Sequence, residues 1–168
     1  DSVTLKDTLI SFAVANRKVS ITLNGKTSKI KTAKNGKVKL STNGLAPGTY
    51  KAKITFSGDS QFGKSSKTVN VVVKKATPKI SLAKMTYKAK EKVKKYKVTL
   101  KNGNNVVKNA KVKLKVNGRT YTAKTNAKGQ VTFKITKLTQ KGTFKAEVKY
   151  DGNRYYNAKT RNSKITIE

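Results

Sequence analysis

The chain of 168 residues carries 40 lysine and arginine residues against seven aspartate and glutamate residues, which gives a formal net charge of +33. It contains no histidine and no cysteine, which excludes disulfide bonds, thiolate chemistry and the side chain that most often acts as base or metal ligand near neutral pH. Such a charge attracts polyanions of any kind, including nucleic acids, anionic lipids and acidic cell-wall polymers. The few arginines are Arg17, Arg119, Arg154 and Arg161.

The first half of the chain reappears in the second half. Glycines mark turns that need a positive φ, so matched glycine spacings indicate matched turns. The matched pairs are Gly25 and Gly36 with Gly118 and Gly129, and Gly48 and Gly58 with Gly142 and Gly152. We also align VTLKD, from Val3, with VTLKN, from Val98. The sequence therefore predicts two copies of one small domain, residues 1–75 and 76–168, as in a modular array.

Apolar and polar residues alternate along the first copy, a pattern that predicts strands with one buried and one exposed face. The apolar positions are Val19, Ile21 and Leu23, then Val38 and Leu40, then Tyr50, Ala52, Ile54 and Phe56. The dipeptide Asn24-Gly25 predicts a two-residue type I′ hairpin turn, and Asn35-Gly36 predicts the closure of the next hairpin.

The second copy follows the same pattern, with hairpin turns predicted at Asn117-Gly118 and Lys128-Gly129. Its predicted strands are 79–83, 95–101, 111–117, 119–125, 130–136, 143–150 and 162–167. No segment repeats apolar residues with helical spacing, so the fold class is all-β, with two tandem antiparallel β-sandwiches. The first copy begins almost at once with VTLKD. We therefore expect it to lack its opening strand, as a repeat cut from a longer array, and to expose an unpaired sheet edge.

A lysine-rich stretch precedes the second VTLK segment. Its candidate contacts for an anionic polymer are Lys84, Lys88, Lys90, Lys92, Lys94, Lys95 and Lys97. Lysines near an anionic surface contribute about 1 kcal/mol each to binding. The alternative is a solvated strand edge whose lysines discourage pairing between sheets. Because lysines recur along every predicted exposed face, we expect a basic coat that binds weakly, multivalently and with strong salt dependence.

The loop before the last strand of the second copy offers a second candidate site. Asn153, Arg154 and Tyr155 place a polar side chain, a cation and an aromatic ring together, a combination that stacks on and hydrogen-bonds sugars. Packing of Tyr155 at the rim of the core is the alternative.

Phe62 aligns with Tyr156, and we expect both to lie in the core. Asp59 and Asp151 are expected to form turns, since isolated carboxylates cannot supply the ligands of a calcium site.

Catalysis is not expected from this sequence. It lacks paired carboxylates, a G-x-S-x-G elbow and a phosphate-binding loop. We assign no catalytic, cofactor-binding or metal-binding residue and expect no cofactor. No apolar run approaches the roughly 20 residues of a membrane span, so no direct membrane insertion is expected.

The segments LAPGTYKAKITFSGDSQFGKSSKTVNVVVKKATPKI at 45–80 and KVKLKVNGRTYTAKTNAKGQVTFKITKLTQKGTFKAEVKYDGNRYYNAKT at 111–160 carry a family resemblance. Together with the VTLK segments, they resemble bacterial immunoglobulin-like (Ig-like) domains that form tandem repeats in surface adhesins. They are most similar to lysine-rich repeats in adhesin-like proteins of methanogenic archaea. The resemblance implies Ig-like β-sandwiches, export to the cell surface or cell wall, and neighbouring repeats of a parent protein as partners. It supplies no catalytic motif.

These observations predict a non-catalytic stalk or adhesion module whose cationic surface meets anionic envelope polymers or the surface of a partner cell. Two alternatives stay open. One is a basic nucleic-acid-binding protein, which the charge favours. The scarcity of arginine and of an aromatic stacking platform argues against specific recognition of nucleic acid. The other is a specific carbohydrate-binding module at the loop that contains Tyr155.

Overall fold

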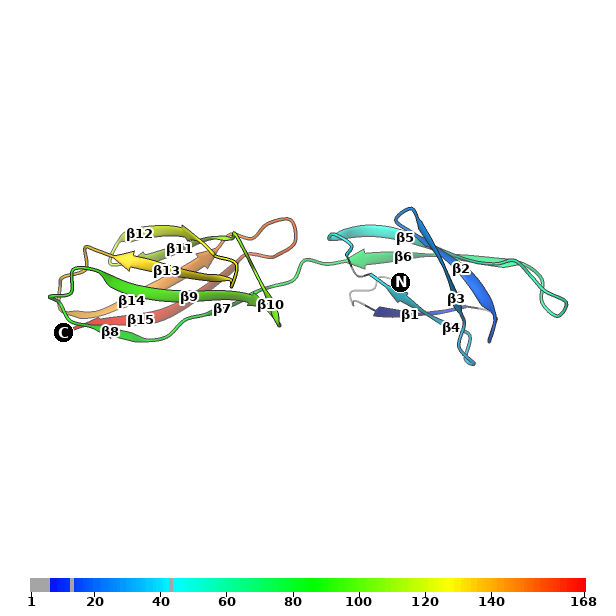
Figure 1. The fold of residues 1–168 in the computed structure, drawn as a ribbon, viewed down its shortest axis with the longest axis horizontal. Helices are drawn as coiled ribbons and strands as arrows, with labels where there is room; N and C mark the ends of the chain where they lie inside the picture. Colours follow the sequence, from blue (N-terminus) through cyan, green and yellow to red (C-terminus); the bar gives the residue numbers. More distant parts are fainter. Residues whose placement is uncertain (1–6, 13, 43) are drawn as a thin grey trace. The chain divides into compact units, whose positions relative to one another are not determined.

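A computed structural model describes residues 7–12, 14–42 and 44–168 of the chain, and within these residues every regular element is a strand (Figure 1). The chain divides into two compact units, Asp1–Lys74 and Lys75–Glu168. This division lies one residue before the boundary that the internal repeat indicates. The all-β fold class is confirmed, and each unit is described in turn.

Unit 1 packs a two-stranded sheet against a four-stranded sheet. Its strands are β1 (Asp7–Ser11), β2 (Lys18–Leu23), β3 (Lys26–Lys31), β4 (Lys37–Ser41), β5 (Gly48–Phe56) and β6 (Ser65–Val73). β1 pairs with β4, and the other sheet has the order β3-β2-β5-β6, with antiparallel pairing throughout. The core consists of Ile10, Phe12, Val14, Val19, Ile21, Val38, Leu40, Ala52, Ile54, Phe56 and Val71.

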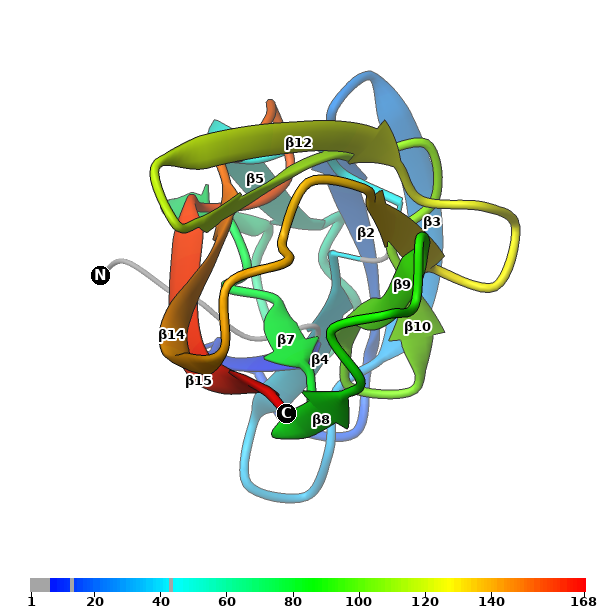
Figure 2. The ribbon, with the colours of Figure 1, turned by 90° about the vertical axis from the view of Figure 1, so that its left-hand side faces the viewer.

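Unit 2 is the fuller copy. Its strands are β7 (Lys79–Ser81), β8 (Met85–Tyr87), β9 (Lys94–Asn102), β10 (Asn105–Val106), β11 (Lys111–Val116), β12 (Arg119–Lys124), β13 (Gln130–Ile135), β14 (Gly142–Tyr150) and β15 (Lys159–Ile167). One sheet has the order β10-β9-β13, with β7 also paired to β9, and the other has the order β12-β11-β14-β15-β8. Figure 2 faces unit 2 and shows β8 beside the end of β15.

Period-two alternation builds the core of unit 2, as the sequence predicts. Along β11 the buried side chains are Val112, Leu114 and Val116, with Lys111 and Lys115 exposed between and beside them. Leu114 is 0% exposed. Burying a leucine of this kind contributes roughly 1.5–3 kcal/mol. β11 therefore presents one apolar face to the other sheet and one lysine-rich face to water.

The two predicted Asn-Gly hairpins are confirmed. Asn24 and Gly25 have φ angles of 51° and 75°, and Asn117 and Gly118 have φ angles of 47° and 73°. Positive φ at both central residues defines the type I′ turn, whose twist matches that of the flanking strands. These turns join β2 to β3 and β11 to β12, which pair over their full lengths.

The next turns, at Asn35-Gly36 and Lys128-Gly129, do not close hairpins, so that prediction is wrong. β3 and β4 lie in different sheets, as do β12 and β13, and the turns carry the chain from one sheet to the other. Each glycine lies against a neighbouring backbone. A Cβ on Gly36 would lie 2.6 Å from the carbonyl oxygen of Phe12, and a Cβ on Gly129 would lie 2.6 Å from that of Leu100. These glycines are required by close approach as well as by positive φ.

The alignment of VTLKD with VTLKN is wrong at Asp7, whose counterpart by strand register is Lys95, and residues 3–6 lie outside the described residues. The N–H of Phe12 donates to Gly36 O, and the N–H of Leu100 donates to Gly129 O, each at 2.8 Å. Phe12 is therefore the counterpart of Leu100, and β1 is the counterpart of β9. Leu100 is separated from Gly129 by more residues than Phe12 is from Gly36, because unit 2 contains a hairpin, β9 to β10, in a segment where unit 1 is shorter.

Two short strands of unit 2, β8 and β10, were not predicted. β8 comprises three residues, of which Tyr87 is buried and Met85 and Thr86 are exposed, so it carries too little alternation to be recognised. It pairs in parallel with β15, an arrangement that no hairpin signal can indicate. β15 also begins at Lys159, three residues before the predicted strand.

Within the described residues, unit 1 shows no counterpart of β7 or β8. In unit 2, β7 pairs with β9 and β8 pairs with β15. Within residues 7–12, 14–42 and 44–74, β6 pairs only with β5, and β1 pairs only with β4.

Three tyrosines lie in the core of unit 2, and burial is the main cause that raises the pKa of each. The pKa of Tyr87 rises from 10.0 to about 12, with smaller contributions from Tyr96 and Glu91. The pKa values of Tyr96 and Tyr150 are raised as well. Because the neutral form is favoured in the folded state, this stabilisation is present below pH 10 and is lost as the pH rises towards 12.

Two of these tyrosines should respond oppositely to loss of the hydroxyl. Tyr96 Oη donates to Ala83 O at 3.0 Å, whereas Tyr150 Oη is buried without a hydrogen-bond partner among the described residues. We expect Tyr96→Phe to lower the free energy of unfolding of unit 2 by about 1 kcal/mol. Tyr150→Phe should leave it unchanged or raise it by up to about 1 kcal/mol. Urea unfolding at neutral pH measures both; equal losses would contradict the assignment.

Candidate functional site

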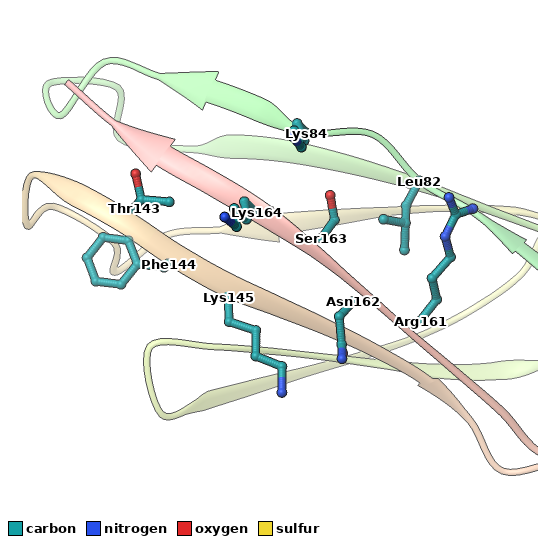
Figure 3. A pocket seen from close by; sticks show the side chains of 9 residues that line it. All are labelled: Leu82, Lys84, Thr143, Phe144, Lys145, Arg161, Asn162, Ser163 and Lys164. Carbon is teal, nitrogen blue, oxygen red and sulfur yellow. The ribbon is translucent and has the colours of Figure 1, made fainter.

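A groove that combines cations with apolar surface lies on unit 2, beside β14 and β15. It has a volume of about 710 Å³. Its lining residues, which define the β14–β15 groove, are Leu82, Lys84, Thr143, Phe144, Lys145, Arg161, Asn162, Ser163 and Lys164 (Figure 3). The lining contains four cations and no carboxylate, so the groove favours an anion.

The antiparallel ladder of β14 and β15 positions the cations. Lys145 lies directly opposite Lys164, and Thr143 lies opposite Thr166, two residues along the same face. The two threonine hydroxyls are 3.2 Å apart and share a hydrogen bond. Like charges placed opposite each other destabilise a sheet. An anionic group bound between Lys145 and Lys164 would relieve this repulsion.

The edge of the groove is built from β15 and the segment between β7 and β8. Arg161 Nη1 donates to Ile80 O at 2.7 Å, which ties β15 to the end of β7. Leu82 lies beside Arg161 in Figure 3, and both Leu82 and Phe144 pack partly buried against the core. The groove therefore offers partly exposed apolar surface next to its cations, which suits the ring of an acidic sugar better than a bare ion.

The predicted lysine stretch does not form one contact surface. Lys84 lines the β14–β15 groove. Lys95 and Lys97 are on the exposed face of β9, in the other sheet, where Lys95 lies opposite Lys134. The remaining exposed members, in the loop from β8 to β9, are Lys88, Lys90 and Lys92.

Lys94 is the one member of that stretch that cannot contact a polymer. It is 1% exposed, and its Nζ donates to Glu91 O at 2.6 Å and to Ala89 O at 3.4 Å. The buried amine therefore holds the loop between β8 and β9 by binding its carbonyls. Its assignment as a polymer contact is wrong, because its position at the start of β9 turns it inward.

The cations of the groove that the sequence analysis missed are Lys145, Arg161 and Lys164. Lys145 and Lys164 occupy ordinary polar positions of alternating strands, whereas Arg161 lies on the side of β15 that buries Ile165 and Ile167, and none of the three belongs to a local motif. Only the pairing of the two strands indicates that these cations are neighbours, because the antiparallel ladder between 142–150 and 159–167 places Lys145 opposite Lys164. That register cannot be read from alternation alone.

Of the candidate glycan contacts, the structure brings Arg154 and Tyr155 together at the surface. The guanidinium of Arg154 lies 5.8 Å from the ring centroid of Tyr155, whose side chain is 50% exposed. Asn153 has a structural role, because its Oδ1 accepts the N–H groups of Tyr155 and Tyr156 at 2.8 and 2.9 Å. The loop also binds the segment that enters unit 2, with the N–H of Ala76 donating to Tyr155 O.

In the corresponding loop of unit 1, the expectation that Phe62 lies in the core is wrong. Asp59 Oδ1 accepts the N–H groups of Gln61 and Phe62, as Asn153 does in unit 2. Phe62 aligns with Tyr156, as predicted, but it is 46% exposed and carries the Arg17 guanidinium 5.3 Å from its ring centroid. It lies outside the core because the loop turns away from the two sheets and uses Arg17 as its support.

An ion pair completes the loop of unit 1. Arg17 Nε lies 2.7 Å from Asp59 Oδ2. The N–H groups of Phe62 and Gln61, followed by Arg17, lower the pKa of Asp59 below its usual 3.8. In unit 2, hydrogen bonding to Lys113 lowers the pKa of Asp151.

A pH titration should reveal the role of Asp59. Because the folded-state pKa is lowered, the stabilisation is present above pH 3.8 and is lost as the pH falls through the lowered pKa. Asp59→Asn keeps the acceptor for the two N–H groups, as Asn153 does, and removes the ion pair. We expect the variant to lose less stability than the parent chain on acidification below about pH 4. Unfolding midpoints measured against pH test this, and parallel curves would contradict it.

In the part of the chain that the structure describes, no three His, Cys, Asp or Glu side chains form a group able to hold a metal ion. The same residues contain no helix of the length and apolarity needed to cross a membrane.

Comparisons with known proteins place the fold. No protein-family model matches the sequence, and no curated protein matches it. A segment of two fibronectin type III domains from chicken tenascin is 11% identical, covers 97% of this chain and 93% of that chain, and has a TM-score of 0.51. This likeness shows that the chain has the fold of tandem fibronectin type III-like β-sandwiches.

Two adhesins were also found with lower scores. A Ca²⁺-stabilised adhesin of an Antarctic bacterium is 19% identical over 92% of this chain, with a TM-score of 0.39. A tetra-tandem repeat from the extending region of a large adhesion protein is 16% identical over 92% of this chain, with a TM-score of 0.46. This chain spans 41% and 42% of their respective lengths. By fold, as the tenascin segment shows, the protein is a tandem of two β-sandwich modules of the fibronectin type III kind.

Proposed function

We propose that the chain is a non-catalytic module of a cell-surface adhesin, with a lysine-rich surface that binds anionic polymers of a cell envelope. The observation that carries the proposal is the arrangement of lysines in the sheets. Among the described strands, six pairs of lysines lie directly opposite each other on neighbouring strands, and we call them the opposed lysine pairs. They are Lys18 with Lys31, Lys111 with Lys124, Lys113 with Lys149, Lys79 with Lys101, Lys95 with Lys134, and Lys145 with Lys164.

Opposed lysines do not stabilise a sheet. The repulsion between the two ammonium groups of each pair lowers the free energy of unfolding that the strand pairing provides. They are well suited to a polyanion, which can bridge both ammonium groups while counterions are released. The pair Lys145 and Lys164 lines the β14–β15 groove with Lys84 and Arg161. The groove is accordingly the strongest single site, and the other pairs form the surrounding coat.

The tandem β-sandwich fold and the resemblance of the sequence to adhesin repeats support a location at the cell surface. Neighbouring repeats of a parent protein are the expected structural partners. The repetition of one module without a catalytic constellation in the sequence also favours a spacer or adhesive role. We infer that the anionic ligand lies in the cell's own wall or on a partner cell.

Sequence-specific recognition of nucleic acid has less support, because two of the four arginines are engaged within the protein. Arg161 binds Ile80 O, and Arg17 pairs with Asp59. Base reading depends chiefly on arginines that are free to form bidentate contacts in a groove. Any binding to DNA should therefore be electrostatic and independent of sequence.

Binding by the full chain to three polymers tests the proposal. The probes are a polygalacturonate, a DNA duplex of similar length and charge, and neutral dextran, each titrated over a series of salt concentrations. We expect affinity for polygalacturonate to fall steeply with salt, by about a thousandfold between 50 and 200 mM if six or more charges are neutralised. Dextran should not bind. Salt-insensitive binding of dextran, or preference for one DNA sequence over another, would overturn the proposal.

A further inference from the structure

We infer that unit 2 binds the surface of an anionic lipid membrane through the outer face of the sheet that contains β7, β9 and β13 (Figure 1). The cations of this surface, which we call the β9 lysine face, are Lys79, Lys95, Lys97, Lys101 and Lys134. All five lysines are exposed. The strands β14 and β15 belong to the other sheet of the unit, so polymer binding in the β14–β15 groove and membrane binding on this face are independent.

The pairing registers spread these lysines over two dimensions. Lys79 lies opposite Lys101 towards one end of the sheet, and Lys95 lies opposite Lys134 towards the other, with Lys97 between the two pairs. Residues 95 and 101 are about 20 Å apart along β9 at roughly 3.3 Å per residue, and three neighbouring strands span about 10 Å. A single polymer chain follows a line across such an area, whereas a membrane surface can contact all five ammonium groups.

The positive charge of the β9 lysine face has no carboxylate beside it on the sheet. The strands β7, β9 and β13 contain no aspartate and no glutamate. On the other sheet of unit 2, by contrast, Lys113 and Lys149 form ion pairs with Asp151, and Lys145 forms an ion pair with Glu147. The internal carboxylates therefore offset the charge of one sheet and leave the charge of the β9 lysine face for an external anion.

A groove of about 350 Å³ adds apolar surface beside β9. Its lining includes Leu82, Ala83 and Met85 from the segment that follows β7, together with Lys95 and Lys97, and it includes no carboxylate. Met85 is 36% exposed. Apolar side chains next to two ammonium groups match a phospholipid, whose phosphate lies close to the first carbons of its chains. A hydrophilic polyanion has no group for the apolar wall, so the groove favours a lipid.

Vesicle binding by the full chain tests the inference. The probes are phosphatidylcholine vesicles that contain about 30% phosphatidylglycerol and vesicles of phosphatidylcholine alone. The variant combines Lys95→Gln, Lys97→Gln and Lys134→Gln. Since each lysine near an anionic surface contributes about 1 kcal/mol, we expect its affinity for the anionic vesicles to fall roughly a hundredfold. Vesicles of phosphatidylcholine alone should not bind the parent chain.

A second triple variant removes the same charge from the other sheet. It combines Lys111→Gln, Lys115→Gln and Lys124→Gln, all at exposed positions of β11 and β12. We expect it to lose less than about fivefold in affinity, through the long-range field alone. Urea unfolding establishes that both variants keep the fold. Equal losses in the two variants, or tight binding to uncharged vesicles, would overturn the inference.

A fluorescent reporter in the groove separates a membrane from a soluble polymer. The chain contains no tryptophan, so Met85→Trp introduces a single one, and Thr122→Trp places one on an exposed position of β12 as the control. We expect anionic vesicles to shift the emission of the Met85→Trp variant to shorter wavelength and to leave that of the Thr122→Trp variant unchanged. Polygalacturonate should shift neither. An equal shift in the two variants, or vesicle binding without a shift in the Met85→Trp variant, would overturn the inference.

Discussion

Replacing Gly129 by alanine is expected to lower the free energy of unfolding of unit 2 by about 3–4 kcal/mol. The residue has a φ of 70°, and a Cβ there would lie 2.6 Å from Leu100 O and 3.1 Å from the Cβ of Val106. The first neighbour is backbone of β9 and cannot swing aside. Both the left-handed conformation and the overlap therefore oppose the substitution. Urea unfolding of the variant, followed by tyrosine fluorescence, measures the loss.

Gly118→Ala is the matched control for this prediction. Gly118 has a similar φ of 73°, but a Cβ there would meet no atom within 4 Å. Its replacement should cost only about 1–2 kcal/mol, which is the conformational penalty alone. Equal losses at the two positions would show that the close approach between the turn and β9 is not what requires Gly129.

Removing the opposed lysine pair from the β14–β15 groove should weaken binding of a short anionic oligosaccharide by roughly 20–30-fold. Each lysine near an anionic ligand contributes about 1 kcal/mol, and two such contributions correspond to that factor. The variant is Lys145→Gln with Lys164→Gln, and the probe is tetragalacturonate, measured by calorimetry at low salt. The substitutions remove the repulsion between the two ammonium groups but also the exposed ion pair of Lys145 with Glu147, at 3.5 Å, so the stability of unit 2 should change little.

The pair Lys111 and Lys124 supplies the control, since these residues lie opposite each other in the same unit but outside the groove lining. Their replacement by glutamine removes the same charge and should weaken binding only a few-fold, through the long-range field. If both double variants lost affinity equally, binding would depend on total charge, and the groove would have no special role.

The sequence predicted most of the strands because buried apolar and exposed polar side chains alternate so regularly along them. Along β9, for example, the side chains of Tyr96, Val98 and Leu100 are buried, and the neighbouring Lys95 and Lys97 are exposed. The Asn-Gly hairpins were predictable for an equally local reason, since type I′ geometry needs two residues that tolerate positive φ.

What the sequence could not indicate is which sheet receives each strand. The glycines at 36 and 129 read as hairpin closures, yet they carry the chain between sheets, because the deciding contact is with the distant carbonyls of Phe12 and Leu100. The counterpart of Leu100 in unit 1 is likewise Phe12, as the hydrogen bonds of these residues with Gly129 and Gly36 show, although the two residues differ. Local identity in a short, low-complexity strand carries little information about pairing partners.

The sequence predicted that the candidate site is cationic, but it did not predict where in the fold the site lies. Lys84 was among the candidate contacts, while Lys145, Arg161 and Lys164 join it only through the β14–β15 register and the path of the segment after β7. Lys94, in contrast, was predicted as a contact residue but lies outside the site. It belongs to the lysine-rich stretch by sequence, but it is buried with its amine bound to Glu91 O, and no local pattern distinguishes it from its exposed neighbours.

A chemical-shift map of the full chain with tetragalacturonate is the most direct measurement of the proposed binding surface. We expect the largest amide shifts at Thr143, Lys145 and Lys164, and we expect salt to reverse them as it screens the charges. Shifts centred on Arg154 and Tyr155, or no shifts at low salt, would contradict the assignment of anionic-polymer binding to the β14–β15 groove.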